Sequence, residues 1–226
     1  MTYARLVALV LLAGGTALVG CSSASHGGGS PTPTPTVPAK AQLKSGLLTA
    51  ADLGNPFSAE NPGQTPTTGT KTSGASNCRA LLAATEGTAS SPKVEVSADF
   101  STDQFPSEIV SQSLLADSAA SVDRGLTEIK DAFTSCRGQF MITNKDGNKL
   151  SFNAQPSNFA AGATGLRLDG SVDDVLPARG YMAIARISRT VVMLFAYYQV
   201  GDKGLPGTAS QIFSTAKNKA TRALRS

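Results

Sequence analysis

The residues best suited to bind a ligand are three charged side chains in the C-terminal half of the chain, Arg167, Asp169 and Arg186. In a strand over 165–172, Arg167 and Asp169 would lie on one face and the leucines on the other, because successive side chains alternate. A guanidinium group offers a planar fork of N–H donors that matches a carboxylate or a phosphate. If the strand ending at Arg186 is a neighbour, a sheet face with two arginines would accept an anionic, partly apolar ligand. The alternative is that both arginines pair with nearby aspartates on a solvated face.

Side chains suited to catalysis are few. The single histidine, His26, lies in a low-complexity segment, which argues against histidine-dependent catalysis. The sequence has no Gly-x-Ser-x-Gly motif that would mark a nucleophilic serine. Asp169, Asp173 and Asp174 could act as paired carboxylates, but aspartates beside a Gly-Ser pair more often form turns. We predict that the protein is not an enzyme and holds no cofactor or metal.

The first twenty residues have the pattern of an export signal. Arg5 precedes an uninterrupted apolar run, Leu6–Ala13, which is too short to span a bilayer. The tetrapeptide that ends at Cys21, Leu-Val-Gly-Cys, resembles the bacterial lipobox, in which the cysteine is diacylated and the preceding peptide bond is cut. We predict a lipoprotein signal peptide over 1–20 and a protein anchored through Cys21 on the outer face of the cell membrane. The alternative is an ordinary signal peptide that happens to end near a cysteine.

The two remaining cysteines, Cys78 and Cys136, form an even pair in a chain sent out of the reducing cytosol. A reactive thiol or a metal pair would need a setting that lowers the thiol pKa or histidine partners, and the folded region has no histidine. We predict one disulfide between Cys78 and Cys136.

Residues 21–42 have the composition of a tether. A Gly/Ser-rich stretch is followed by alternating proline and threonine, which favours an extended spacer. Removal of residues 1–20 takes away Arg5 and no acidic residue, so 19 basic and 16 acidic residues remain, a net charge of +3. This balance is too mild and too dispersed to indicate a nucleic-acid partner.

Residues 43–226 alternate between strand and helix patterns and predict one domain. In 190–200 both alternating sets of side chains are apolar or aromatic, which predicts a strand covered on both faces. The segment 107–116 fits a strand, although a helix competes, and 55–76 reads as a long loop anchored by Phe57. An Asp-Gly pair within 144–148 predicts a hairpin turn. Further strands are predicted at 93–100, 139–143, 149–154, 164–172 and 180–188.

Three helices complete the pattern, at 47–54, 118–136 and 206–225. Cys136 lies on the apolar stripe of the second helix, and Asn77–Leu82 would begin a helical turn that the disulfide pins. The last helix carries Lys217, Lys219, Arg222 and Arg225, which could touch anionic headgroups. A solvated face is the preferred explanation, since cations are also favoured near a helix C-terminus. The predicted fold class is α+β, an antiparallel sheet of about six to seven strands with helices packed on it and one disulfide.

Residues 43–226 resemble a known family of extracellular domains. The shared features are the lipobox, the Pro/Thr spacer, Leu-Thr-Ala-Ala-Asp-Leu-Gly over 48–54, the Asn-Cys-Arg at 77–79, a helix ending in Ser-Cys at 135–136, and a closing strand-strand-helix. With these features, the chain is similar to actinobacterial lipoproteins related to the extracellular sensor domain of PknH-type Ser/Thr kinases. The resemblance implies an antiparallel sheet flanked by helices around a cleft, with a ligand not identified. The chain departs from the family in having no kinase domain and one cysteine pair where two disulfides are expected.

The expected function is therefore that of a membrane-anchored extracytoplasmic lipoprotein, a non-enzymatic sensor or ligand-binding module. A lipid or glycolipid carrier is one alternative, and an envelope protein-interaction module is the other. The expected partners are the membrane, through the lipid on Cys21, and a small ligand or an envelope protein.

Overall fold

The computed structural model of the chain describes residues 35–54, 56–60, 71–74, 78, 92–143, 149–201 and 206–225. Its centre is one antiparallel sheet of nine strands in the order β1-β3-β4-β9-β8-β7-β6-β5-β2. The strands are β1 (Phe57–Ala59), β2 (Lys71–Gly74), β3 (Val94–Thr102), β4 (Ser107–Ala116), β5 (Gly138–Thr143), β6 (Lys149–Ser157), β7 (Thr164–Val172), β8 (Leu176–Arg186) and β9 (Val191–Val200).

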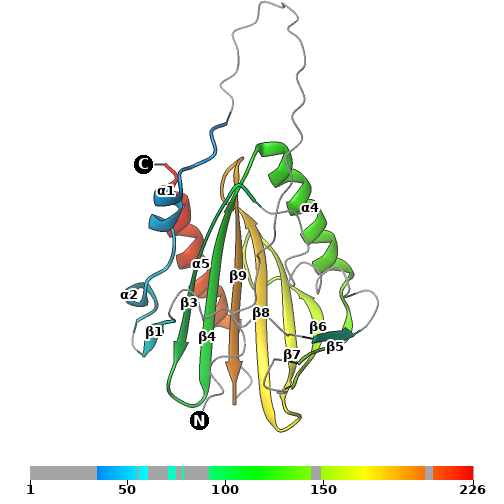
Figure 1. Cartoon of the computed structure of the whole chain (residues 1–226). Coiled ribbons are helices and arrows are strands. Elements are labelled where there is room, and N and C mark those ends of the chain that lie inside the picture. The colour runs from blue at the N-terminus through cyan, green and yellow to red at the C-terminus, as the bar shows by residue number, and fades with distance from the viewer. Residues whose placement is uncertain are drawn as a thin grey trace, which may run out of the picture.

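The described helices lie on both faces of this sheet: α1 (Lys40–Ser45), α2 (Ala50–Leu53), α4 (Ala119–Ser135) and α5 (Pro206–Ala223). In Figure 1, α4 covers one face beside β7 and β8, while α5 runs behind the sheet with α1 beside its C-terminal end. The predicted α+β class and the antiparallel sheet are confirmed, but the sheet has nine strands where about six to seven were predicted, because β1 and β2 add two short edge strands. Among the described residues, no helix combines the length and the apolar content needed to cross a lipid bilayer.

Strand β9 joins the two halves of the sheet. It pairs with β4 on one side and with β8 on the other, although β4 ends at Ala116, 75 positions before β9 begins at Val191, and β8 directly precedes β9. Both of its faces are buried, as the apolar pattern of 190–200 predicted. The reason is that each face of β9 belongs to a different hydrophobic core.

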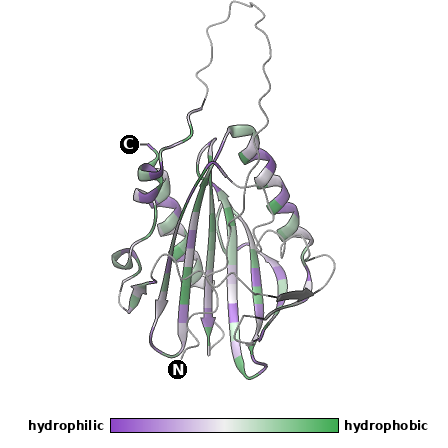
Figure 2. Ribbon diagram, viewed as in Figure 1, coloured by the Kyte–Doolittle hydropathy of each residue, from purple (hydrophilic) through white to green (hydrophobic). Residues whose placement is uncertain are grey.

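The two cores are separated by the sheet. The first core lies under α4 and includes Val122, Leu126 and Phe133 of that helix with Tyr198 of β9. Ser118 begins α4 by accepting a hydrogen bond from the Ser121 N–H at 3.2 Å, as expected of a serine N-cap. Figure 2 shows apolar and polar bands alternating along β7 and β8, which is the pattern of strands that pack an apolar face.

The second core lies under α1, α2 and α5. Leu43, Leu47 and Leu48 from the N-terminal segment meet Phe213 and Ala220 of α5 there. The short helix α2 begins after Thr49, whose N–H donates to Asp52 Oδ2 at 2.7 Å, and ends at Gly54 with φ +79°. The predicted helix at 47–54 is thus confirmed in its central turn, with the N-cap and the glycine stop where the sequence placed them.

Two sequence-based boundaries differ from the structure. Residues 35–42 were assigned to the tether, but Val37 packs against the second core and α1 begins at Lys40. The segment 55–76 was read as a loop, but it contributes the edge strands β1 and β2, of three and four residues. Strands this short carry too few side chains to show an alternating pattern. They are defined by backbone pairing with neighbouring strands, which the sequence does not show. Phe57 does pack against the second core, as predicted.

Several predicted features lie outside the described residues. These are the signal peptide at 1–20, Cys21, the tether up to residue 34, the helical turn from residue 79 onward, and the turn at 144–148. The strands that flank this last turn, β5 and β6, pair as an antiparallel hairpin with Thr143 opposite Lys149.

Candidate functional site

Arg167 and Asp169 lie side by side on β7, as predicted, and a second arginine joins them from β8. The register places Asp169 opposite Arg179 and Arg167 opposite Tyr181. Asp169 accepts a hydrogen bond from Arg167 Nε through Oδ2 and another from Arg179 Nε through Oδ1, both at 2.5 Å. One carboxylate therefore serves two guanidinium groups, on the face of the sheet that carries α5.

Arg186 does not join this cluster, so the single two-arginine face that the sequence suggested is wrong. Arg186 stands four residues after Met182, which pairs with Leu166, and side chains four apart on a strand share a face. Arg186 is therefore on the face of Leu166 and α4, opposite to Arg167. There its Nη2 bonds the carboxylate of Asp123 on α4. The alternative, in which the arginines pair with nearby aspartates, agrees with the structure for both Arg167 and Arg186.

The Arg167–Asp169–Arg179 cluster continues as a polar band across the sheet. Burial would lower the pKa of Arg179, but Asp169 outweighs it and raises that pKa. Burial raises the pKa of Tyr181, with the two arginines opposing. Farther along, the Tyr197 hydroxyl donates to Glu108 Oε1 at 2.7 Å. The charged groups of this band thus have hydrogen-bond partners within the protein. The band is therefore better described as a structural network than as a ligand-binding site.

Arg186, by contrast, lines a pocket between α4 and the sheet. The pocket has a volume of about 240 Å³. Leu126 and Ile184, which are 5% and 0% exposed, supply its apolar wall. Lys130 and Arg186 supply its cationic groups. The remaining wall is the loop that leads into β7, Gly162–Ala163–Thr164.

The two cations of this pocket differ in their partners. Asp123 neutralises Arg186 in part, but that ion pair is open to water, with the two side chains 37% and 64% exposed. Within the described part of the chain, no hydrogen bond or ion pair engages the Lys130 ammonium. The pocket therefore carries a net positive charge beside apolar side chains. Such a combination binds a small anion that has an apolar part.

The three aspartates considered for paired-carboxylate catalysis have other roles. Asp169 is held between two arginines. Asp173 and Asp174 have φ of 49° and 57° in the β7–β8 turn, and Asp173 Oδ1 accepts the Lys149 N–H at 2.8 Å. Aspartate is one of the few residues that tolerate this backbone region, so the turn interpretation fits their geometry. Within the described ranges, no three His, Cys, Asp or Glu side chains lie together in a way that could hold a metal ion.

Carboxylates on β3 form a separate half-buried group on the α4 side of the sheet. Burial raises the pKa of Asp99, and the charge of Glu60 raises it further. The Ser111 hydroxyl acts in the opposite direction, although its geometry falls short of a hydrogen bond. Burial also raises the pKa of Glu95. Both carboxyls thus prefer the protonated form more than they would in water.

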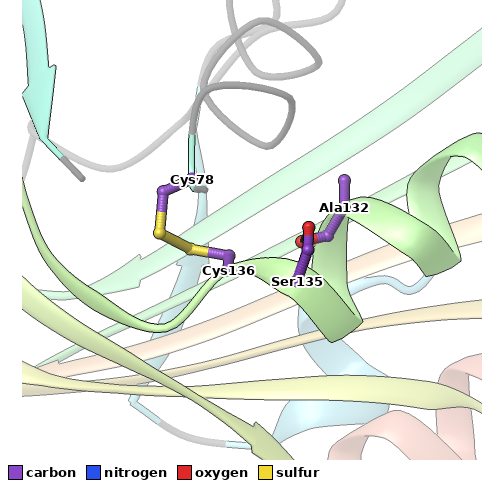
Figure 3. Close-up of a disulfide and its surroundings, with 4 residues drawn as sticks. All are labelled: Cys78, Ala132, Ser135 and Cys136. Atoms are coloured by element: carbon purple, nitrogen blue, oxygen red, sulfur yellow. Dashed lines mark hydrogen bonds between the residues drawn. A yellow bond between two sulfur atoms is a disulfide. The ribbon is translucent and has the colours of Figure 1, made fainter. Parts of the chain in front are cut away.

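The predicted disulfide is present. Cys78 and Cys136 are bonded, with their Cα atoms 4.3 Å apart and a sequence separation of 58. Figure 3 shows the bond leaving the end of α4, where Cys136 follows Ser135. Both cysteines are fully buried in the first core. The bridge therefore fixes the C-terminal end of the helix that covers the pocket.

Sequence reasoning missed Lys130 and Arg179. The strand containing Arg179 was predicted to begin at 180, whereas β8 begins at Leu176. Lys130 falls within the helix predicted at 118–136. Its spacing of four from Leu126 places it one turn along the same side of α4, but which strand that side meets depends on the packing of the helix.

Comparison with known proteins supports the fold. No protein-family model matches the chain, and no curated protein matches it. Among solved structures, the crystal structure of the extracellular domain of PknH from Mycobacterium tuberculosis is similar with a TM-score of 0.59 and 14% sequence identity. The match covers 83% of this chain and 98% of that one. The resemblance inferred from the sequence is thus confirmed for the fold: this chain folds like the extracellular domain of PknH.

Proposed function

We propose that this chain is a lipid-anchored, extracytoplasmic sensor or ligand-binding module, and that it is not an enzyme. The observation that carries ligand binding is the pocket of about 240 Å³ in which Lys130 and Arg186 flank an apolar wall. The fold shared with an extracellular domain and the buried disulfide support an oxidising compartment outside the cytosol. The Leu-Val-Gly-Cys sequence that ends at Cys21 supports the lipid anchor.

The ligand that suits this pocket is a small anion with a short apolar part. Pockets for drug-sized ligands usually measure about 300–1,000 Å³, so this one suits a smaller molecule. Its size is also the reason that we prefer a small ligand to the acyl chains of a lipid carrier. A carboxylate or phosphate would bind between the Lys130 ammonium and the Arg186 guanidinium, and the apolar part would lie against Leu126 and Ile184.

The binding of butyl phosphate, measured by calorimetry and by NMR shifts of pocket residues, tests this proposal. Lys130→Gln and Arg186→Gln should each weaken binding about tenfold, the usual effect of removing one charged hydrogen-bond partner. Arg124→Gln is the matched control, because Arg124 is exposed on α4 but does not line the pocket. Equal affinity in all four proteins would rule this pocket out. Mass spectrometry of small molecules that co-purify with the protein would then identify the natural ligand.

A further inference from the structure

The chain enters the domain at the end of the sheet where β9 begins. The Thr190 hydroxyl, just before β9, donates to the carbonyl oxygen of Thr36 at 3.2 Å. The side chain of Gln42 in α1 donates to the carbonyl oxygen of Ala223 at 3.3 Å, near the C-terminal end of α5. Figure 1 shows α1, the C-terminus and the first described residues gathered at this end. The tether thus leaves the domain beside α1 and the end of α5.

Exposed cations from four separate elements surround this point. They make no ion pair with any described residue, and we call them the basic end: Lys40 and Lys44 on α1, Lys93 before β3, Arg189 in the β8–β9 turn, and Arg222 and Arg225 at the end of α5. Two other lysines of α5 have partners within the protein. Lys219 pairs with Asp52, and Lys217 donates to the carbonyl oxygen of Ala161.

None of the described carboxylates forms an ion pair with the cations of the basic end. Asp52 is held by Lys219 and Asp123 by Arg186. Asp117 Oδ1 accepts the Ser118 N–H at 2.5 Å at the start of α4. Glu95 is half-buried on the α4 side of the sheet. The hydrogen bond leaves the charge of Asp117 in place, but among the described residues the six exposed cations of the basic end outnumber the carboxylates there.

At the opposite end of the sheet, three described aspartates outnumber the one exposed lysine, Lys149, that lies beside the β7–β8 turn. Asp103 lies in the β3–β4 turn, and Asp173 and Asp174 lie in the β7–β8 turn. All three are exposed, and these two turns lie at the end of the sheet away from α1 (Figure 1). Among the described residues, the exposed charge is therefore distributed unevenly along the strands. It is mainly positive at the end where the tether leaves and mainly negative at the β3–β4 and β7–β8 turns.

The helix dipole explains only part of this arrangement. Cations at the end of α5 are favoured there, which accounts for Arg222 and Arg225. Lys93 and Arg189 belong to strand ends and turns, and Lys40 begins α1 and so lies at its positive pole. Attraction to one external anionic surface therefore explains the gathering of these cations better than the stability of a single helix does.

From this arrangement we propose that the basic end is the membrane-facing surface of the domain and docks on anionic lipid headgroups. The inference rests on the anchoring proposed above. Thirteen residues separate Cys21 from Pro35, and extended they reach about 45 Å. A tether of this length allows the domain to rotate relative to the membrane, so the tether does not determine which face of the domain points toward the membrane. The cations set it, since each one near an anionic surface strengthens attachment about fivefold.

Lysine labelling of the acylated protein in vesicles tests the proposal. The protein is reconstituted in neutral phosphatidylcholine vesicles or in vesicles that also contain phosphatidylglycerol, then acetylated sparingly and mapped by mass spectrometry. Labelling of Lys40, Lys44 and Lys93 should fall several-fold in the anionic vesicles only. It should recover at high salt, which screens the attraction. Lys149, beside the far turn, should be labelled equally in both.

Two single variants give a matched comparison. Arg222→Gln removes a charge from the basic end without removing a labelled lysine, and it should weaken docking about fivefold. Lys149→Gln removes one charge from the far end and should leave docking unchanged. Equal lysine labelling in the two kinds of vesicle, or protection of Lys149 in their place, would overturn the proposal. Loss of the protein from neutral vesicles would instead contradict the lipid anchor, so the two failures are distinguishable.

Discussion

Gln112 is a buried polar residue that joins the N-terminal segment to the sheet. Its side chain is 0% exposed and lies on β4, facing the second core. Its Oε1 accepts the Leu48 N–H at 2.6 Å, and its Nε2 donates to the carbonyl oxygen of Gly46 at 3.3 Å. A glutamine amide thus satisfies two backbone groups that the turn between α1 and α2 would otherwise bury without partners.

Replacement of Gln112 by leucine should lower the free energy of unfolding by about 1–3 kcal/mol for each buried backbone group left unpaired. Urea unfolding monitored by circular dichroism measures the change. Gln155→Leu is the matched control, because Gln155 is exposed on β6 and should change stability little. Equal stability of the two variants would show that Gln112 does not secure the segment.

Asp99 gives a prediction of how stability depends on pH. Burial and the charge of Glu60 raise the pKa of Asp99 in the folded protein. The folded state then holds a proton that the unfolded state, with a pKa near 3.9, has released. Stability therefore falls as the pH rises from about 4 through the raised pKa, and the charged form opposes folding at neutral pH.

Asp99→Asn should accordingly be more stable than the wild type at pH 7, and the difference should shrink as the pH falls through the raised pKa toward about 4. Denaturant unfolding at pH 7 and pH 3.5 measures both values. Asp103→Asn, in the exposed turn that follows β3, provides the control and should not show this pattern. A variant at Asp99 that is less stable at pH 7 would contradict the argument.

At the scale of elements, two glycines differ in whether the structure leaves room for a side chain. A Cβ added to Gly170 of β7 would come within 1.8 Å of the Ser151 carbonyl oxygen on β6, whereas one added to Gly125 of α4 meets nothing within 4 Å. Gly170→Ala should destabilise the protein by at least about 1–3 kcal/mol, because backbone must move. Gly125→Ala should stabilise it by about 0.5–1 kcal/mol, because alanine favours a helix. Thermal unfolding of both variants checks the opposite signs.

The disulfide acts on the end of α4. Replacement of both Cys78 and Cys136 by serine should cost about 4 kcal/mol, the contribution of closing a loop of this length in the unfolded chain. Equilibrium unfolding gives the value, and the reduced wild type should behave like the double variant. Unchanged stability after both treatments would mean that packing in the first core alone holds the end of the helix.

The sequence predicted the long elements because their side chains carry a clear period. β4, β7, α4 and α5 agree with the prediction to within a few residues, and β9 was recognised as buried on both faces. The helix α1 and the strands β1 and β2 were not predicted, since three to six residues show no reliable period. Pairing with β3 and β5 fixes the two short strands, and a single sequence does not show such long-range contacts.

At the scale of the whole molecule, the site was only partly predictable. Which residues share a face of one strand follows from alternation, so Arg167 and Asp169 were placed correctly. Whether Arg186 shares that face depends on the register between two strands, and a shift of one residue reverses the answer. The observed register separates it from Arg167. The pocket likewise depends on where α4 crosses the sheet, which the residue pattern of the helix does not encode.

The proposed lipid anchor is also a prediction about the whole molecule. Cys21→Ala should abolish acylation and either release the protein from the membrane fraction or leave the signal peptide uncut. Metabolic labelling with a fatty acid and fractionation measure both results. Arg5→Lys keeps the charge of the signal region and should leave acylation intact. Continued acylation of the alanine variant would show that another residue carries the lipid.

The central position of β9 has a consequence for the order in which the protein can assemble. Before residues 191–200 have been synthesised, β3–β4 and β5–β8 belong to separate sheets, because β9 is the strand that joins them. During that interval β4 and β8 are both edge strands, with unpaired backbone groups and apolar side chains exposed. The second core also requires α5, which follows β9 in the sequence. Until β9 and α5 have been made, the nascent chain therefore holds two incomplete halves, whose exposed strand edges favour aggregation.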